Sequence, residues 1–452
     1  MHINREKVAT FLSALLILFL ITPISSSFAA TTGSAPCITS VTTSATVKTI
    51  YTGGNCYIVF TGGANNWFAP SNVSSVSILV IGGGGAGGSV AWGGGGGAGG
   101  IVWDTSYPVT PSTSYSLTVG DSGTPGPPLS TATSDFPSTR SQNGGDSWFY
   151  SNSTFVAKGG GAGSSYAYST TASTYCDGAA GGSGGGATEC NVTGHTNAGG
   201  ATTQTLPTGA NLYWGYAGGN TATNSNQSGG GGGGSGGVGK PSAASQSPGA
   251  GGDGTTYFKP LLTAIASLMP QAWQDTTTNG NIAGGGGGAA SAGAAGGAGG
   301  GGAGGTNGVN YSNGTSGVPN TGSGGGGASC CSPIGTGGYG GSGLIVIQYA
   351  ANINTSISIA LAGNATTGTY RSPITINATT VNNNANVKFF QNGKVIPGCQ
   401  SVASVNFQAS CTYRPSIIGQ LFIKAVLVAS GGFYSSNSLP VNISVAARAG
   451  KR

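Results

Sequence analysis

The sequence predicts an all-β protein with two units, a glycine-rich unit of strands and packed glycine segments and a smaller C-terminal β-sandwich. Gly makes up 90 of the 452 residues, and 5% of the residues are charged. An ordinary domain has about 7% Gly and about 25% charged residues. Of the glycines, 77 lie in residues 82–350. Short β-branched and aromatic runs flank that stretch on both sides and recur in residues 354–446, which is typical of strands.

This composition excludes several classes of protein. So few charges do not suit a coiled coil, a helical bundle or a charged disordered tail. Gly does not recur at every third position, so the chain is not collagen. The 15 Lys and Arg residues are thinly spread against 9 Asp and Glu residues, without the basic clusters of nucleic-acid readers. We therefore expect no nucleic-acid partner.

Residues 1–29 are typical of a secretory signal peptide. Arg5 and Lys7 precede an apolar stretch over residues 8–21, which is shorter than the ~20 residues of a membrane-spanning helix. Ser27 and Ala29 favour cleavage after Ala29. The sequence thus predicts export to the cell surface or the extracellular space, with no membrane span in the mature chain.

The eight cysteines all follow this leader, and an even number in an exported chain predicts disulfides. The simplest pairs are 37–56, 176–190 and 399–411; alternatively, the adjacent residues 330 and 331 bridge to 176 and 190, because a bond between neighbours is strained. The candidates are Cys37, Cys56, Cys176, Cys190, Cys330, Cys331, Cys399 and Cys411. Ten Asn-x-Ser/Thr sequons make glycosylation candidates of Asn72, Asn152, Asn191, Asn226, Asn310, Asn313, Asn354, Asn364, Asn377 and Asn442.

The remaining chemistry is sparse. His2 lies in the leader, which leaves His195 as the sole histidine of the mature chain, and a multi-histidine metal site cannot be built from it. Several of the carboxylates stand in Asp-Gly and Asp-Ser contexts that are typical of turns. We therefore expect no metal, no cofactor and no enzymatic activity.

The glycine-rich unit, residues 30–350, begins and ends with strands. The predicted strands are residues 47–51, 56–60, 76–81, 101–103, 115–119, 147–150, 155–157 and 344–349. The Gly runs between them are either flexible linkers or a packed array of extended helices with three residues per turn. We favour the packed array, because several long structureless loops in one domain are rare.

One stretch of this unit has helical periodicity. Between Pro260 and Trp273, apolar residues recur on one helix face, with Pro260 suited to the first turn. We expect a short helix that covers the glycine array.

Residues 351–446 form the predicted C-terminal unit, followed by a basic tail at 447–452. About seven short strands at regular spacing favour an immunoglobulin-like sandwich, and Asn392-Gly393 predicts a tight hairpin. The predicted strands are residues 357–362, 374–378, 387–390, 394–396, 402–407, 420–428 and 441–445. Residues 351–452 hold eight Lys and Arg and no acid, a charge of +8, whereas residues 31–350 hold five basic and eight acidic residues, a charge of −3.

Several ordered segments carry a family resemblance. They are residues 77–88, 93–102, 115–120, 143–149, 155–163 and 340–349, each a strand joined to a Gly run or the reverse. With them the chain resembles, over residues 44–350, the secreted glycine-rich domain of phage tail-fibre adhesins, microbial surface proteins and the extracellular region of anaplastic lymphoma kinase receptors. The resemblance implies a jelly-roll sandwich with an inserted polyglycine-II helix bundle. Residues 411–419 resemble the Ig-like repeats of bacterial and archaeal surface proteins.

Aromatic residues beside the Gly runs are the candidate ligand-binding positions. They are Trp92, Tyr166, Tyr168, Tyr213, Trp214 and Trp273. Such rings either stack on sugars and dock on proteins, or they cover the ends of the array. The first alternative predicts a non-enzymatic adhesin whose loops bind a cell-surface glycan or protein. The charge difference between the units favours another function, a structural subunit that joins copies of itself head to tail in a filament or surface layer.

Overall fold

The computed structural model describes residues 37, 46–70, 73–127, 140–166, 176–189, 197–207, 210, 212–221, 227–243, 246–307, 313–330, 335–351, 357–380, 385–428 and 436–448. The predicted leader and residues 449–452 of the basic tail lie outside them. Strands dominate the described residues, and the fold is all-β with few helices. Among these residues, no helix has the length and apolarity that crossing a membrane requires.

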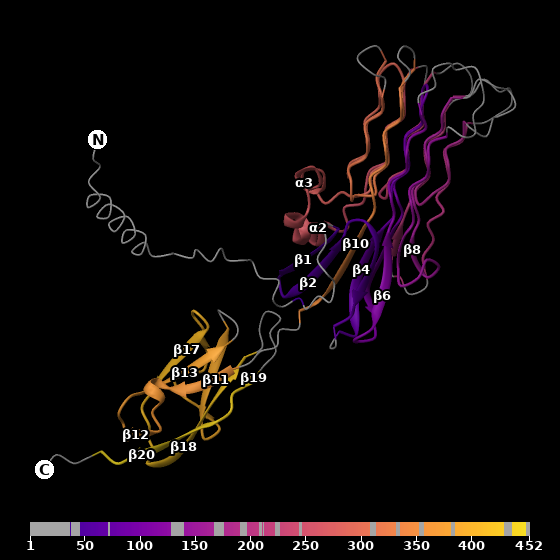
Figure 1. Ribbon diagram of the computed structural model, residues 1–452. Coiled ribbons are helices and arrows are strands. Elements are labelled where there is room, and N and C mark those ends of the chain that lie inside the picture. Colours follow the sequence, from indigo (N-terminus) through magenta and orange to yellow (C-terminus); the bar gives the residue numbers. More distant parts are fainter. Residues whose placement is uncertain are drawn as a thin grey trace, which may run out of the picture. The chain divides into compact units, whose positions relative to one another are not determined.

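Two antiparallel sheets form the base of the glycine-rich unit (Figure 1). The six-stranded sheet has the order β1 (Val47–Thr52), β2 (Asn55–Phe60), β10 (Leu344–Ala350), β4 (Ser75–Ile81), β5 (Ile101–Pro108) and β9 (Leu212–Trp214). The four-stranded sheet has the order β3 (Gly63–Phe68), β6 (Ser114–Val119), β7 (Ser147–Phe149) and β8 (Phe155–Ala157). Strand β10 lies between β2 and β4, so the end of the glycine-rich unit closes the sheet that its beginning opened.

The core lies between these two sheets. Alternate residues of β4 point into it, and Ile78 and Val80 are fully buried there, because successive side chains of a strand face opposite sides. From the four-stranded sheet, Trp67 packs at 5.9–6.2 Å, between ring centroids, on Tyr115, Phe149 and the β10 residue Tyr349. Aromatic pairs at this separation contribute beyond their buried area.

A helical segment covers the other face of the six-stranded sheet. It consists of α2 (Lys259–Ile265), the 3-10 turn η3 (Ala266–Leu268) and α3 (Gln271–Thr277). Its apolar face packs with Leu79 and Ile81 of β4. The predicted single helix is therefore divided in two at Pro270, and it mainly covers the sheet and not the glycine array. The reason is that the outward face of β4 is itself apolar and needs a cover.

The Gly runs form a packed lattice of extended rods that run side by side away from the sheets (Figure 1). The rod of residues 93–100 illustrates the bonding. Successive N–H groups of Gly97, Ala98 and Gly99 donate to three different rods, with N–O distances of 2.8, 2.9 and 2.7 Å. Bonds to one neighbour recur at every third residue, as a helix with three residues per turn requires.

The same rod accepts bonds from three further rods. The carbonyls of residues 96, 97 and 98 accept N–H groups of Gly286, Gly85 and Ser183 at 2.8–2.9 Å. It thus has six bonded neighbours, the arrangement of a hexagonal array. Because most peptide groups of the rods bond to one another, the lattice buries its backbone with few charged side chains, in keeping with the low charge of the chain.

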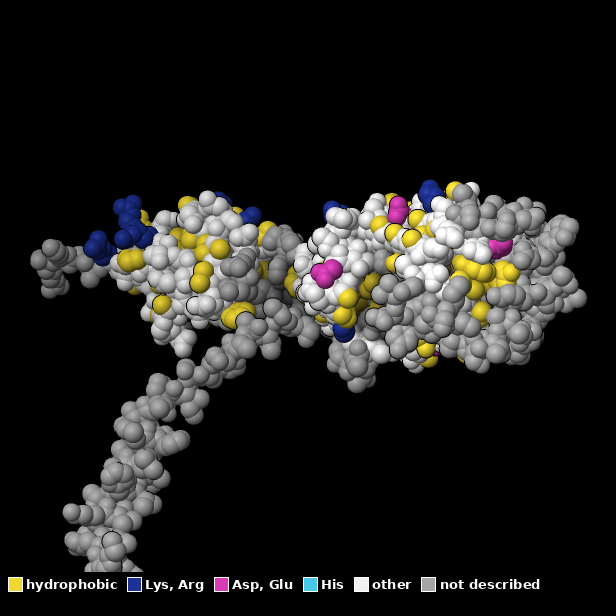
Figure 2. All heavy atoms as spheres, turned by 90° about the horizontal axis from the view of Figure 1, so that it is seen from above, with side chains coloured by type: hydrophobic (Ala, Val, Ile, Leu, Met, Phe, Trp, Pro, Cys, Tyr) yellow, Lys and Arg dark blue, Asp and Glu magenta, His cyan; other side chains and the backbone are white. Residues whose placement is uncertain are grey.

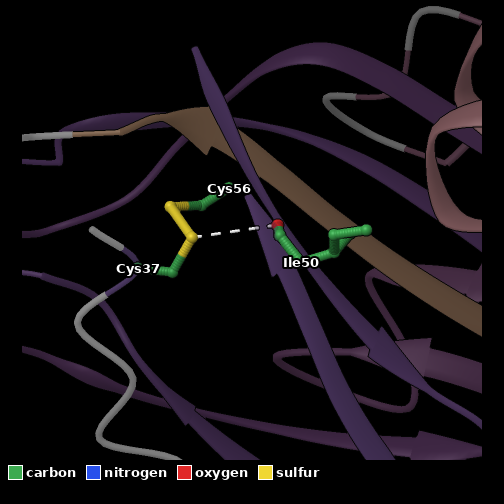
Figure 3. The surroundings of a disulfide bond; sticks show 3 residues. All are labelled: Cys37, Ile50 and Cys56. Atoms are coloured by element: carbon green, nitrogen blue, oxygen red, sulfur yellow. Dashed lines mark hydrogen bonds between the residues drawn. A yellow bond between two sulfur atoms is a disulfide. The ribbon is translucent and has the colours of Figure 1, made fainter. Parts of the chain in front are cut away.

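A disulfide fixes the start of the chain to the sandwich. Cys37 is bonded to Cys56 of β2, with a Cα–Cα distance of 5.5 Å. The Cys37 sulfur lies 3.8 Å from the carbonyl oxygen of Ile50 in β1, and a dashed line joins the two atoms in Figure 3. A disulfide sulfur carries no proton, so this approach is a van der Waals contact. The disulfide therefore holds residue 37 against β1 and β2.

The C-terminal unit is a second two-sheet sandwich with its own core. One sheet contains β11 (Ile357–Leu361), β13 (Ile374–Thr380) and β17 (Gln408–Tyr413). The other has the order β12 (Thr367–Thr369), β20 (Val441–Ala446), β18 (Gly419–Leu427), β14 (Asn386–Gln391) and β15 (Lys394–Val395). Two further short strands pair with this sheet, β16 (Val402–Ala403) with β14 and β19 (Ser436–Asn437) with β18. A 3-10 turn, η4 (Ala362–Asn364), follows β11. The predicted disulfide between Cys399 and Cys411 is present.

The predicted strand over residues 402–407 is wrong beyond Ala403. Asn406 and Phe407 have φ angles of 51° and 64°, which belong to a turn and not to a strand. The following residues form β17, which is not among the predicted strands. Its inward residues Ala409, Cys411 and Tyr413 alternate with polar ones, but they include no β-branched residue.

The sandwich of the glycine-rich unit is expected to lose stability at high pH through Tyr349. Its hydroxyl is buried and has no hydrogen-bond partner among the residues that the structure describes, and burial raises the pKa of Tyr349 to about 12. Above pH ~10 the unfolded chain loses the phenolic proton while the folded chain keeps it. Stability present below pH ~10 is thus lost as the pH rises to ~12, by roughly 2 kcal/mol. Chemical denaturation at several pH values checks this, with Tyr349→Phe as a control that should remove most of the loss.

Candidate functional site

The topology places one set of turns at the end of the lattice remote from the sheets. The rod of residues 82–88 continues from β4, and the rod of residues 93–100 leads into β5. The turn that joins them, residues 89–92, therefore lies at the far end, here termed the distal end. The turn of residues 290–293 lies at the same end, because the N–H of Ala289, just before it, donates to the carbonyl oxygen of Gly93, just after the first turn.

Hydrogen bonds to neighbouring rods hold the turn of residues 89–92. The Ser89 hydroxyl donates to the Gly126 carbonyl oxygen at 2.6 Å and accepts the Gly337 N–H at 3.0 Å. The Thr188 hydroxyl donates to the Trp92 carbonyl oxygen at 2.6 Å. The turn is thus fixed by three segments that are distant in sequence, and its position depends on the whole lattice.

Two of the predicted ligand-binding aromatics meet at this turn. Trp92 contacts Tyr166 edge to face, with ring centroids 5.1 Å apart, and both rings are half-buried. They pack beside Val90, Ala91 and Cys330 in a small apolar cluster. The cluster combines residues from three distal segments, and Trp92 and Tyr166 are both partly exposed in it.

The backbone of this turn is strained. Val90 has a φ of 83° and Trp92 a φ of 40°, in the left-handed region that side chains other than Gly rarely adopt. For the β-branched Val90 such a conformation is an outlier that persists only when surrounding contacts impose it. The lattice therefore fixes the direction in which the Trp92 side chain projects.

The other predicted ligand-binding residues do not join this pair. Tyr168 and the side chain of Tyr213 lie outside the described part of the chain. Trp214, at the end of β9, packs on Tyr257 and Phe258 with ring centroids 5.3 and 5.0 Å away, beside α2. Trp273 is 1% exposed within the core between α3 and the sheet, and its indole N–H donates to the Asn320 carbonyl. In this structure Trp273 is therefore part of the core, and the expectation that it contacts a ligand stays a prediction.

The described carboxylates mainly serve the backbone. Asp146, Asp177 and Asp253 each accept a backbone N–H from a neighbouring segment at 2.8–2.9 Å. Asp146 also pairs with Lys158 at 2.8 Å on an exposed surface. Within the described ranges, no cluster of His, Cys, Asp or Glu is suited to a metal ion, and His195 lies outside them. Asp104 accepts the Ser106 N–H within strand β5, and Asp275 accepts the Gln271 side-chain N–H within α3.

A family model described as a glycine-rich domain matches residues 60–350, about two thirds of the chain. The chain belongs to this family. The match begins at the last residue of β2 and ends with β10, so it includes the whole lattice and nearly all of the sandwich. A search among curated proteins found no matching relative.

The remaining predicted sites of the glycine-rich domain are placed only in part. Cys176 and Cys330 are disulfide-bonded, whereas Cys190 and Cys331 lie outside the described residues, so both predicted connectivities stay open.

Half of the predicted glycosylation sequons lie outside the described residues, namely those at Asn72, Asn191, Asn226, Asn310 and Asn354. Asn152 and Asn313 are exposed on this domain, and Asn364, Asn377 and Asn442 belong to the C-terminal sandwich.

Proposed function

We propose that this chain is a non-enzymatic exported adhesin whose glycine-rich domain presents its distal turns to a cell-surface glycan or protein. The observation that carries the proposal is the Trp92–Tyr166 pair, fixed on a strained turn by hydrogen bonds from three other segments. A rigid, partly exposed aromatic pair loses little conformational entropy on binding, which favours contact with a sugar ring or an apolar protein surface.

The absence of charge at the described distal turns favours a neutral ligand. Residues 89–92 and 290–293 contain no charged side chain. Recognition there would depend on stacking, apolar contact and hydrogen bonds from exposed peptide groups. A neutral oligosaccharide fits this chemistry better than a phosphate or a polyanion.

The finer description of the fold belongs to the same proposal. We infer that the base of the glycine-rich domain is a jelly roll and that the C-terminal sandwich is Ig-like. The second inference is supported by the parallel pairing of β12 with β20 beside the antiparallel strands β18 and β14, and by the separate sheet of β11, β13 and β17. The C-terminal sandwich would act as a spacer or an anchor.

Trp92→Ala is expected to weaken binding of the chain without residues 1–29 to its best arrayed oligosaccharide or target cell by at least about tenfold, as for an aromatic hot spot. Tyr166→Ala should act in the same direction. The matched control is Tyr150→Ala, which removes an aromatic ring 56% exposed on the sandwich. Glycan arrays and cell-binding titrations measure the effect, and equal binding by all three variants would contradict the proposal.

The charge difference between the units supports a second function, a head-to-tail structural subunit. In Figure 2 the visible acidic side chains lie on the glycine-rich domain, the larger body, and none is seen on the C-terminal sandwich. Salt-sensitive filaments in sedimentation and electron micrographs of the same preparation would favour this alternative over the adhesin.

A further inference from the structure

The outer face of the larger C-terminal sheet carries an unusual apolar patch. An antiparallel sheet with one face on the core normally presents polar residues to water on the other face. Here Phe422, in the long central strand β18, is 52% exposed, and Val395 in β15 is 40% exposed. Phe390 of β14 is half-buried between them, paired with Lys424 on one side and Val395 on the other. The three apolar residues, Phe390, Val395 and Phe422, are termed the sheet patch.

A glycosylation sequon lies directly beside this patch. Asn442 of β20 is the cross-strand partner of Phe422, so that their Cβ atoms are roughly 5 Å apart on the same face. Asn442 is exposed, and its side chain makes no hydrogen bond to any described residue. The sequon continues with Ile443, which is buried, and Ser444, which is exposed on the same face as Asn442.

The other described sequons lack this combination. Asn377 is half-buried and accepts the Ser410 hydroxyl at 2.8 Å, and Asn313 accepts the Thr336 N–H at 2.8 Å. Asn364 is exposed in η4, and Asn152 is exposed in the turn after β7. Neither belongs to the sheet that carries the patch.

We propose that Asn442 carries an N-linked glycan whose first sugars cover Phe422 and the rest of the sheet patch. The apolar face of a sugar ring would remove Phe422 from water, which accounts for a large aromatic at this position. Lys424 flanks the ring and would donate hydrogen bonds to sugar hydroxyls. The patch is thus a glycan-covered surface and not a free docking site.

The modification is an ordinary oligosaccharyl transfer. The Asn442 amide nitrogen forms a bond to the anomeric carbon of a polyprenol-phosphate-linked oligosaccharide. The bond between that carbon and the phosphate oxygen breaks, the lipid phosphate leaves with the electron pair, and the amide loses one proton. This transfer rests on the proposed export, because the donor and the transferase act on chains that cross the membrane.

The test is secretion of the full chain by a eukaryotic host that glycosylates Asn-x-Ser/Thr, followed by glycopeptide mass spectrometry. Chain retained inside the cells would overturn the proposed export, independently of Asn442. Chain in the medium with a glycan on Asn442 is the expected result. Exported chain that is glycosylated at other sequons and bare at Asn442 would overturn the present inference alone.

A second measurement separates coverage of the patch from simple occupancy. Asn442→Gln should raise the binding of a hydrophobic dye severalfold and promote self-association, whereas the matched control Asn364→Gln should change neither. Adding Phe422→Ser to Asn442→Gln should restore the low dye binding. Equal dye binding by the Asn442 and Asn364 variants would show that the glycan does not cover the patch, and would overturn the inference.

Discussion

Gly232→Ala is expected to lower the melting temperature of the glycine-rich domain by roughly 5–10 °C, which corresponds to about 3 kcal/mol. A Cβ atom at Gly232 would lie 1.9 Å from the carbonyl oxygen of Gly96 in a neighbouring rod. That oxygen already accepts the Gly286 N–H at 2.8 Å. The clash is with backbone, so no side chain can rotate away, and one rod must move and break bonds to others.

The matched control for this variant lies in the same Gly run. At Gly237 an added Cβ would meet no heavy atom within 4 Å, so Gly237→Ala should leave the melting temperature nearly unchanged. Calorimetry of the two variants and the parent makes the comparison. Equal, small shifts would mean that the run is a flexible linker, which was the other alternative for the Gly segments.

Trp273→Ala is expected to destabilise the glycine-rich domain by about 3–5 kcal/mol, the usual effect of removing a large buried aromatic. Its ring fills the space between α3 and the six-stranded sheet, next to Leu262 and Ile265. Its indole N–H donates to the Asn320 carbonyl at 2.9 Å, at the start of a lattice rod. The variant thus leaves a cavity and a carbonyl without its partner.

This variant distinguishes a structural role from a ligand-binding one. Trp92→Ala, at the distal end, should keep the melting temperature near that of the parent protein while weakening binding. Trp273→Ala should do the reverse, with Trp273→Phe intermediate in stability. If Trp273→Ala melted like the parent and lost binding, the side chain would be a ligand contact after all.

The sequence predicts that the candidate site consists of aromatic residues beside Gly runs, but it does not show which of these residues come together. Trp92 and Trp273 occupy similar contexts, since each is an aromatic residue near a Gly run. The two residues differ in where the fold places their segments. Residues 89–92 join two rods at the distal end, whereas the helical segment that contains Trp273 packs on the six-stranded sheet. The hydrogen bonds that fix Ser89 come from rods up to 248 residues away, and no local pattern encodes them.

Local composition by itself determined the all-β class and most strand positions. Strands such as β4 and β10 are β-branched runs whose preference is intrinsic, and the disulfides 37–56 and 399–411 join near neighbours in sequence. Strand β3, with Gly-Ala-Asn-Asn before Trp67, has no such preference and exists because it pairs with β6. The lattice likewise depends on tertiary contacts and not on a local preference. One Gly run gains nothing by ordering, and only six bonded neighbours at once offset the entropy that Gly loses.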